Sequence, residues 1–423
     1  MAEKLAINGG NAVRMASWPR WPQYDTLEEN HLLEVFRSGE WWRSFDEQDP
    51  SLSRVARFQN DFAHAHDCRY GICTTNGTVS LEIALRAGGV KPGDEVIVPA
   101  YTFIATATAP LMIGAIPIFV DMDPDTYTMD IDRVRAAITE KTRAIIPVHF
   151  AGQACDMDAI NALAQEHDLF VLEDAAHAHG ASYKNRACGS LAHAGSFSFQ
   201  ASKNMTAGEG GIITTNDADY AERCETLVWA GRQHGKAWYN HEVLASNARM
   251  TEFQGALLSA QLTRLKAQTE KRTLNARYLH EHLSQIEGIS PVAVSPNTSV
   301  HAYHLYMFRY DASAFSGLSK TAFVNALQAE GITGASAGYV WPIYRNPVFE
   351  KKQFLGGSFP VDERIYGKDI DYSAFAAVCP VSERACDSEA VWLPQNLLLA
   401  ETSDMADIVE AVRKIQALAS TVQ

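Results

Sequence analysis

The pattern that most restricts the fold of this chain is an alternation of short apolar segments with amphipathic helical segments, which starts at about residue 68. The apolar segments that predict strands are residues 70–74, 95–98, 116–121, 144–149, 169–174, 195–199 and 211–214. Between them, residues 79–88 and 156–167 show the apolar spacing of helices. This alternation predicts an α/β fold with a mostly parallel sheet covered on both faces. In such sheets ligands bind beyond the carboxyl ends of the strands.

A long helix is predicted at about residues 251–283, because apolar residues recur there at helical spacing. Further elements are predicted after it: a strand at 302–310 and helices at 320–330 and 404–419. The polar, glycine-rich stretch 356–371 predicts a surface loop. The 423 residues suffice for two packed units. We expect a large α/β domain with an N-terminal arm in residues 1–265 and a smaller α+β domain in residues 266–423.

Charge and composition argue against several classes of partner. The chain has 36 Lys and Arg against 50 Asp and Glu, a net charge of −14 that repels nucleic acid and anionic lipid. The start of the sequence lacks the apolar core of a secretion signal. Residues 96–120 carry no charge and could span a bilayer, but Pro99, Pro110 and Pro117 favour buried strands and a short helix. The seven cysteines form no CxxC pair, which argues against a zinc site or a disulfide framework and indicates a reducing cytoplasm.

Two polar clusters precede predicted helices. In Thr74–Thr78, small hydroxyl and glycine residues at a helix start offer backbone N–H groups and the positive end of the helix dipole to an anion. Taken alone, the cluster fits a helix cap with a tight turn better. The second cluster, Ala245–Met250, can equally be a plain N-terminal cap of the long helix.

An acidic residue ends one of the predicted strands. Asp174 closes an apolar strand and is followed by small residues, which places a carboxylate at the floor of a cleft. It could bind a metal together with His177 and His179, or hold a protonated ring nitrogen. Two histidines at this spacing are poor evidence for a metal, and histidines satisfied by ordinary hydrogen bonds are commoner.

Lys203 follows a strand of aromatic residues and serines and precedes the glycine-rich turn Gly208–Gly211. A loop lysine is ordinarily just solvated, but a buried one loses its proton more easily and becomes a nucleophile for carbonyls. An anion-binding turn, a strand-end aspartate about a hundred residues later and a lysine about thirty residues after that together predict a site for pyridoxal phosphate (PLP). Asp174 would then keep the pyridine nitrogen protonated.

A series of segments carries a resemblance to a known family, among them SGEWWRS, TTNGTVSLEIAL, GDEVIVPAYTFIATATA, PVHFAGQACDMDAI, EDAAHAHGA, SFSFQASKNMTAGEGG, SNARMTEFQGAL, HLYMFRY and CPVSERA. From about Trp18 to the C-terminus the chain resembles the DegT/DnrJ/EryC1/StrS aminotransferases of sugar and cyclitol biosynthesis. The resemblance implies the fold-type I architecture of PLP-dependent transferases and PLP as cofactor.

The resemblance also implies roles for single residues. Lys203 matches the lysine that forms a Schiff base with the cofactor, and Asp174 matches the partner of the pyridinium nitrogen. Phe103 falls where an aromatic ring stacks on the cofactor, and His177 where a Gln or His touches the side of the ring. The positions that match the phosphate cradle are Gly77, Thr78 and Ser198. Asn247 matches an asparagine that reaches the phosphate of the neighbouring subunit, which implies a homodimer with shared sites.

The implied reaction is a two-stage transamination between small molecules. The stretch from Trp18 to Asp25 and the tail that begins CPVSERA look most similar to glutamine-dependent inosose aminotransferases and to aminohydroxybenzoate synthases. We therefore expect L-glutamine as the amino donor and a keto-cyclitol, or a keto-sugar without a nucleotide, as the acceptor, in aminocyclitol or amino-sugar antibiotic biosynthesis. Four residues suited to a polyhydroxylated ring are expected in the substrate pocket, namely Trp42, Arg43, Arg249 and Tyr344. Core packing explains the tryptophans equally well.

Other functions remain open at this point. WPQYD, EWWR and MTAGEGG also resemble 3-amino-5-hydroxybenzoate synthases, and Pro394-Gln395 replaces a polar or histidine pair expected in these relatives. Family members that dehydrate deoxysugars resemble the others with histidine at the lysine position, so Lys203 argues against that activity. A regulator that binds PLP without catalysis is a further alternative, although no basic DNA-binding segment supports it.

Overall fold

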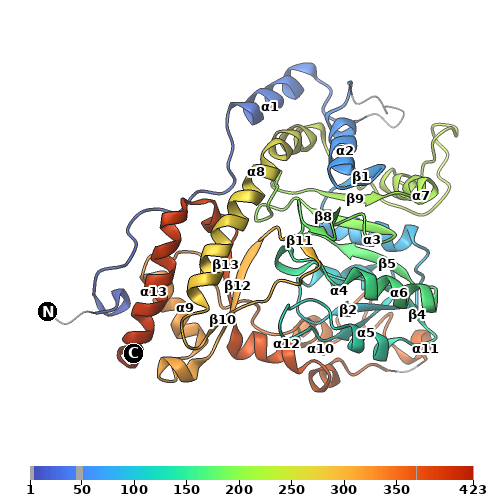
Figure 1. Cartoon of the computed structure of the whole chain (residues 1–423). Helices are drawn as coiled ribbons and strands as arrows, with labels where there is room; N and C mark the ends of the chain where they lie inside the picture. Colours follow the sequence, from blue (N-terminus) through green and yellow to red (C-terminus); the bar gives the residue numbers. More distant parts are fainter. Residues whose placement is uncertain (1–3, 44–50, 368, 423) are drawn as a thin grey trace.

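The computed structural model describes residues 4–43, 51–367 and 369–422, and a seven-stranded sheet forms its centre (Figure 1). The strands follow the order β1-β9-β8-β5-β4-β2-β3. Their bounds are β1 Tyr70–Thr74, β2 Glu95–Pro99, β3 Ile116–Val120, β4 Thr142–Ile145, β5 Phe170–Asp174, β8 Ala194–Ser198 and β9 Gly211–Thr215. β9 is antiparallel to its neighbours β1 and β8, whereas β8, β5, β4, β2 and β3 pair in parallel. The predicted mostly parallel α/β fold is confirmed.

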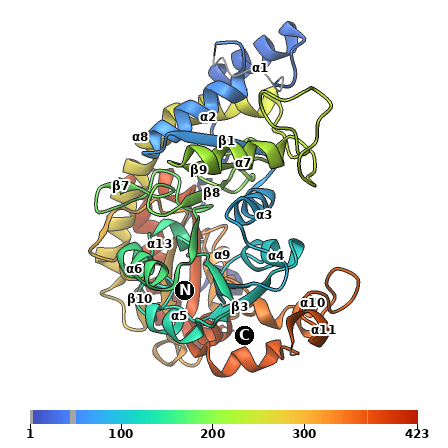
Figure 2. The same ribbon diagram turned by 90° about the vertical axis from the view of Figure 1, so that its right-hand side faces the viewer.

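Helices cover both faces of this sheet, as Figure 2 shows for α3 and α4 on one side and α5 and α6 on the other. The first face carries α3 Gly77–Ala87, α4 Ala105–Met112 and α7 Ala218–Val228. The second carries α2 Arg54–Ala65, α5 Ile131–Ala137, α6 Met157–His167 and the first part of α8 Glu252–Leu283. Successive residues of a strand point to opposite faces, so Val96 and Val98 pack into the first layer and Ile97 into the second. Strands buried on both faces explain the continuous apolar runs in the sequence.

The predicted long helix, α8, leads from the large sheet to a smaller C-terminal unit. Here the three-stranded sheet β10-β12-β13 packs against α9, α13 and the end of α8. The bounds are β10 Ile289–Pro291, β12 Leu305–Tyr310, β13 Ala390–Pro394, α9 Lys320–Ala329 and α13 Met405–Ala417. A further small sheet joins β11 Thr298–Val300 to the hairpin of β6 Ser182–Tyr183 and β7 Arg186–Ala187. The remaining α-helices are α1 Thr26–Ser38, α10 Pro347–Glu350, α11 Glu363–Tyr366 and α12 Pro380–Arg384.

The packed cores do not follow the predicted division at residue 265. Leu5 and Trp18 lie in the core of the C-terminal unit, although they stand at the start of the chain. Conversely, residues between Ile343 and Cys379 pack into the core on the first face of the large sheet. The chain therefore crosses between the two units four times, whereas a single cut allows one crossing. The additional crossings bury apolar side chains that the sequence pattern alone does not assign to a partner.

Two local predictions also need correction. β4 ends at Ile145 rather than at residue 149, because Pro147 has no N–H for the ladder and only an isolated bridge at Val148 continues the pairing. The stretch 356–371 is more than a surface loop, since it contains α11, whose Tyr366 is buried and hydrogen-bonds the carboxylate of Glu95. Among the described helices none has both the length and the hydrophobicity that a membrane span needs.

Candidate active site

A cavity of about 560 Å³ opens where strands β1, β5 and β8 end, and it collects the residues predicted for the cofactor. The predicted residues that line it are Gly77, Thr78, Phe103, Asp174, His177, Ser198 and Lys203. They come from the loops or helix starts that follow different strands, as the rule for parallel sheets predicts. Asn247 does not line this cavity and is exposed on the surface of the chain.

The N-terminus of α3 forms one end of the cavity and suits an anion. Asn76 caps the helix by accepting a hydrogen bond from the N–H of Val79 at 2.9 Å. Within the described structure, the preceding N–H groups of Gly77 and Thr78 donate to no protein acceptor, so they remain for a ligand. A Cβ at Gly77 would lie 2.6 Å from Cβ of Ser198, which explains why only glycine fits where the helix start meets the Ser198 hydroxyl. These groups fit the phosphate of PLP.

Asp174 stands at the carboxyl end of β5, on the floor of the cavity. Thr106 donates a hydrogen bond to its Oδ2 at 2.8 Å, and the N–H of Ala176 donates to Oδ1 at 3.2 Å. Burial raises the pKa of the Asp174 carboxyl, and the hydrogen bond from Thr106 opposes that rise. A buried carboxylate of this kind is stabilised most by a cationic N–H donor facing it, which is what a protonated pyridine nitrogen provides.

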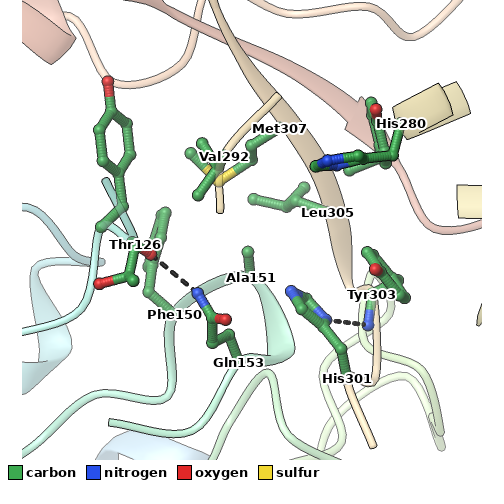
Figure 3. Close-up of a pocket in the computed structure, with 12 residues that line it drawn as sticks. Thr126, Phe150, Ala151, Gln153, His280, Val292, His301, Tyr303, Leu305 and Met307 are labelled. Atoms are coloured by element: carbon green, nitrogen blue, oxygen red, sulfur yellow. Dashed lines mark hydrogen bonds between the residues drawn. The ribbon is translucent and has the colours of Figure 1, made fainter. Parts of the chain in front are cut away.

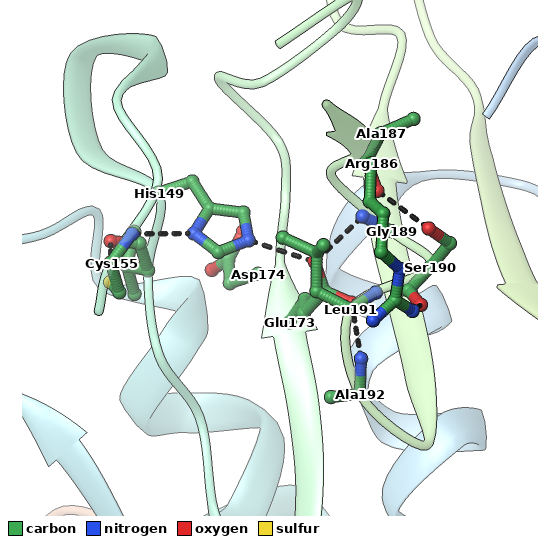
Figure 4. Close-up of polar contacts among 12 residues, drawn as sticks. His149, Cys155, Glu173, Asp174, Arg186, Ala187, Gly189, Ser190, Leu191 and Ala192 are labelled. Atoms are coloured by element: carbon green, nitrogen blue, oxygen red, sulfur yellow. Dashed lines mark hydrogen bonds and ion pairs between the residues drawn. The ribbon is translucent and has the colours of Figure 1, made fainter. Parts of the chain in front are cut away.

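Glu173 and His149 form a network of hydrogen bonds next to Asp174, as Figure 4 shows. His149 accepts a hydrogen bond at Nδ1 from the N–H of Cys155, so its proton lies on Nε2 and is donated to Glu173 at 2.9 Å. The other donors to the Glu173 carboxylate are the N–H groups of Gly189, Leu191 and Ala192, at 2.6 to 3.0 Å. Four donors thus hold a fully buried carboxylate whose backbone continues directly into Asp174.

The alternative of a metal site at Asp174 does not match this geometry. His179 lies among the rings of Phe62, Phe197 and Phe199 instead of beside Asp174. Among the described residues, the one group of three possible ligands that converges is His149, Glu173 and Cys188. There, the lone pairs of Glu173 and of Nδ1 of His149 already accept the hydrogen bonds described above.

Lys203 lies on the loop after β8 and reaches the cavity as a half-buried side chain. The backbone N–H of Lys203 donates to the carbonyl of Gln200, and the Gln200 side chain accepts hydrogen bonds from Ser202. A tight turn therefore fixes the loop. Burial lowers the pKa of the Lys203 amine to about 8, although the nearby Asp174 carboxylate raises it. An amine with this pKa is substantially neutral near pH 8 and can attack a carbonyl carbon.

The sides of the cavity carry the two remaining predicted contacts. Phe103 follows β2, and 57% of its surface is exposed, as expected of a ring that stacks on a ligand. His177 accepts a hydrogen bond at Nδ1 from the N–H of Ala151 at 3.3 Å, which leaves the proton on Nε2. Burial lowers the pKa of His177 well below its ordinary value, so the ring is a neutral donor.

A second cavity of about 420 Å³ adjoins the first and shares Phe103, His177, Ser202 and Lys203 with it. Its other walls come from the N-terminal arm and from the C-terminal unit: Trp21, His304, Leu305, Tyr339, Trp392, Pro394, Gln395 and Asn396. Apart from the Pro394-Gln395 pair, which the resemblance had already singled out, none of these residues was predicted for the site. His304 and Leu305 belong to the HLYMFRY segment, and Trp392 to Asn396 belong to the tail that begins CPVSERA, but nothing local to either segment predicts that both face Lys203.

A third cavity lies between Phe150 and β12 and is too small for a substrate (Figure 3). Its volume is about 20 Å³, which is room for little more than one water molecule. Gln153 hydrogen-bonds the carbonyl groups of Thr126 and Ala293 beside it, and the Nδ1 of His301 accepts from the N–H of Tyr303. The hydrogen bond from Gln153 to Ala293 joins the large unit to the C-terminal unit.

The comparisons with known proteins agree with this site. The model of the DegT/DnrJ/EryC1/StrS aminotransferase family matches residues 25–380. The chain belongs to this family. An L-glutamine:2-deoxy-scyllo-inosose aminotransferase of Streptomyces paromomycinus is 37% identical over 98% of both chains, and a 3-amino-5-hydroxybenzoate synthase of Amycolatopsis mediterranei is 35% identical over 95% of this chain and 98% of the relative. A crystal structure of 3-amino-5-hydroxybenzoic acid synthase superimposes with a TM-score of 0.84 at 34% identity, covering 95% of this chain and 99% of the other.

This DegT/DnrJ/EryC1/StrS family member is a PLP-dependent aminotransferase, which excludes the alternative of a regulator without catalysis. When bound, PLP supplies an electron sink for the carbanion formed at the amino donor. We propose that Lys203 holds it covalently, that Asp174 faces its ring nitrogen and that the start of α3 with Ser198 holds its phosphate, since these groups line one cavity.

The predicted substrate residues lie elsewhere in this aminotransferase. Tyr344 was wrongly predicted to line the pocket: it is fully buried in the core beside Phe119 and donates a hydrogen bond to Glu383 at 2.7 Å. Arg43 is also buried, and Glu225 accepts two hydrogen bonds from its Nη2.

The other two lie at the surface near Asn247. The guanidinium of Arg249 lies 5.8 Å from the ring of Trp42, and neither residue lines the two cavities that share Lys203.

Replacing Lys203 by alanine (Lys203→Ala) is expected to abolish turnover and the visible absorption of the lysine-bound cofactor, because among the described residues no other lysine lines either cavity. The measurement is a spectrum after removal of free PLP, followed by an activity assay. The matched control is Lys184→Ala, which removes an exposed lysine paired with Asp158 and should keep both properties. If the visible band persists in Lys203→Ala, the attachment point is another lysine.

Proposed function

We propose that this aminotransferase moves the amino group of L-glutamine to a keto-cyclitol, or to a keto-sugar that carries no nucleotide, in the biosynthesis of aminocyclitols or amino sugars of antibiotics. The observation that carries the proposal is the full-length similarity to L-glutamine:2-deoxy-scyllo-inosose aminotransferases, at 36 to 37% identity over 97 to 98% of this chain. The cavity beside Lys203 supports it, because aromatic faces and amide groups are suited to a polyhydroxylated ring.

The residues of the chain perform both halves of this reaction at one place. With the cofactor held, Nζ of Lys203 would take the proton from the α-carbon of the amino donor and deliver it to the cofactor carbon that receives the nitrogen. In the second half it would move a proton in the opposite direction, to the carbon of the bound acceptor. Asp174 keeps the ring nitrogen protonated throughout, which stabilises negative charge at that carbon. The rings of Phe103, Tyr339 and Trp392 limit the water that reaches Lys203.

A 3-amino-5-hydroxybenzoate synthase activity is the alternative, and the structural similarity with a TM-score of 0.84 favours it. We place it second because the relatives with aminocyclitol names match over a slightly larger share of this chain, 97 to 98% against 95%.

L-glutamine is expected to convert the loaded enzyme to its aminated form in a single turnover, and L-glutamate is expected to react much more weakly. The assay is the loss of the visible absorption of the lysine-bound cofactor across a panel of amino donors. Candidate acceptors are then screened for recovery of that absorption. If L-glutamate works and L-glutamine does not, or if only nucleotide-linked sugars restore the band, the proposed substrates are wrong while the aminotransferase activity stands.

We also propose a homodimer in which Asn247 reaches the phosphate site of the neighbouring subunit. Asn247 is exposed and lies outside its own cavity. The segment just before it exposes large apolar residues, with Trp238 74%, Tyr239 79% and Leu244 89% exposed, as expected of a surface that another subunit covers. Trp42 and Arg249 adjoin Asn247 and would then contribute to the neighbouring site.

Mixing Lys203→Ala subunits with Asn247→Ala subunits tests this sharing. If Asn247 acts on the neighbouring site, each heterodimer contains one doubly damaged site and one intact site. Activity should then rise clearly above that of the two separate variants. Distinct affinity tags verify that heterodimers have formed. Activity no higher than the sum of the separate variants, in verified heterodimers, contradicts the sharing.

We further propose that the enzyme works in the cytoplasm. All seven cysteines are unpaired and buried in the described structure. Burial also raises the pKa of most of these thiols, which keeps them unreactive. Reduced thiols of this kind fit a reducing compartment.

A further inference from the structure

A buried arginine stands behind the wall of the cavity that adjoins Lys203. Arg272 of α8 is fully buried, and its Nε and Nη2 both donate hydrogen bonds to Oε1 of Gln395, at 3.0 and 2.5 Å. Within the described part of the chain it makes no ion pair, and its Nη1 has no hydrogen-bond partner. Burial lowers the pKa of the guanidinium to about 9, which still leaves it charged at neutral pH. A buried cation without a counter-ion is costly, so its retention calls for an explanation.

Arg272 fixes the orientation of the Gln395 side chain. A guanidinium offers only hydrogen-bond donors, so the amide oxygen of Gln395 must face it and the amide nitrogen Nε2 must point the other way. Gln395 lines the cavity next to Lys203, and its Nε2 donates to no described residue. Nε2 keeps some accessible surface, whereas Nη1 of Arg272 is fully buried and has no hydrogen-bond partner. The amide nitrogen therefore reaches the surface of the cavity as an unused donor.

Three neighbouring donors on this wall are already engaged. The indole N–H of Trp21 donates to the carbonyl of Ala201, that of Trp392 to the hydroxyl of Tyr101, and the amide of Asn396 to the carbonyl of Pro19. The ring of Trp21 covers Arg272, whose guanidinium carbon lies 5.6 Å from the ring centre. Gln395 is thus the link through which the buried charge acts on the cavity.

The charges around this cavity favour an anion. None of the described residues that line it is Asp or Glu. His177 and His304 are neutral, because burial lowers the pKa of both well below the ordinary value. The carboxylates of Asp174 and Glu209 line the other cavity, where Asp174 is proposed to face the cofactor ring. When Lys203 is used for the cofactor, Arg272 is the remaining positive charge at this wall.

We propose that Gln395 is a specificity-determining residue that binds the α-carboxylate of the amino donor through Nε2, and that Arg272 is the positioning residue that orients this amide and supplies the compensating positive charge. The inference rests on the proposed function in one respect, that an amino acid is the donor. The proposal gives a function to Gln395 of the Pro394-Gln395 pair. At these two positions, a polar or histidine pair is expected in similar proteins.

The loaded wild-type enzyme provides the first test, without any variant. It is mixed with L-glutamine or with the α-amide of L-glutamine, with no acceptor present, and the apparent Kd and limiting rate are read from the visible absorption. L-Glutamine is expected to bind at least about tenfold more tightly, since a charge-assisted hydrogen bond contributes about that factor or more. Equal apparent Kd values for the acid and the amide overturn the proposal.

Gln395→Glu provides the second test. The new carboxylate still accepts both hydrogen bonds from Arg272, but it turns an acceptor oxygen toward the cavity and repels the donor carboxylate. The apparent Kd for L-glutamine is expected to rise at least about tenfold, and the preference for the acid over the amide is expected to vanish. Gln395→Met, which keeps the length and removes the donor group, should lose the preference as well.

The control is Gln268→Glu, which adds the same charge on α8 one turn before Arg272. Gln268 bonds Gln23 and lines neither cavity, so the preference for the acid should remain. A change confined to the acceptor half-reaction of Gln395→Glu contradicts the proposal and assigns the amide to an acceptor hydroxyl instead. If no L-amino acid reacts even with the wild type, the proposed function fails; if L-glutamine reacts but the variants keep their preference, only this inference fails.

Discussion

The contact on which the rest of the site depends is the one that holds the Asp174 carboxylate in a buried position on the floor of the cavity, where we propose that it faces the cofactor ring. Burial by itself favours the neutral acid, as the raised pKa of Asp174 reflects. The hydrogen bonds from Thr106 and Ala176 stabilise the charged form and fix its direction. The next residue back along the strand, Glu173, accepts four hydrogen bonds, so β5 cannot shift without breaking several contacts at once. The electron sink of an aminotransferase needs a rigid charged partner, and the fold provides one.

The parallel sheet explains how residues far apart in the sequence meet around this carboxylate. The α3 start, Asp174 and Lys203 follow three different strands whose carboxyl ends lie at one edge of the sheet. The C-terminal unit then closes the site from the opposite side with Trp392, Gln395 and His304. Under the proposed roles, cofactor and substrate are held mainly by different units, and Lys203 lies where the two cavities meet.

Much of this arrangement could be predicted from the sequence, because it rests on local patterns. The apolar runs predicted every strand of the large sheet, and helical spacing predicted α8 almost to the residue. That the start of α3, Asp174 and Lys203 meet in one cavity was predicted because the order of an anion-binding turn, an aspartate and a lysine is itself a signal. Pro147 shows where a local rule was overlooked, since a proline in a strand predicts an early end of the ladder.

The rest depended on contacts between distant residues. Tyr344 looks like a pocket residue in the sequence, but the chain between Ile343 and Cys379 returns to the large sheet and buries it. The orientation of Gln395 follows from Arg272, which is 123 residues away in the sequence. Nothing in the neighbouring residues of either one indicates that they meet. Packing partners of this kind are decided by the whole fold rather than by a local period.

The central claim is that Asp174 keeps the cofactor ring protonated, and the turnover of Asp174→Asn tests it most directly. Asparagine has nearly the same shape but cannot stabilise a positive ring nitrogen. The variant should retain PLP, because the phosphate groups at α3 are intact, while turnover falls at least about a hundredfold, which corresponds to roughly 3 kcal/mol of barrier. Asp168→Asn, at the exposed end of α6, is the matched control and should keep normal turnover. Near-normal turnover in Asp174→Asn with bound PLP would contradict the account.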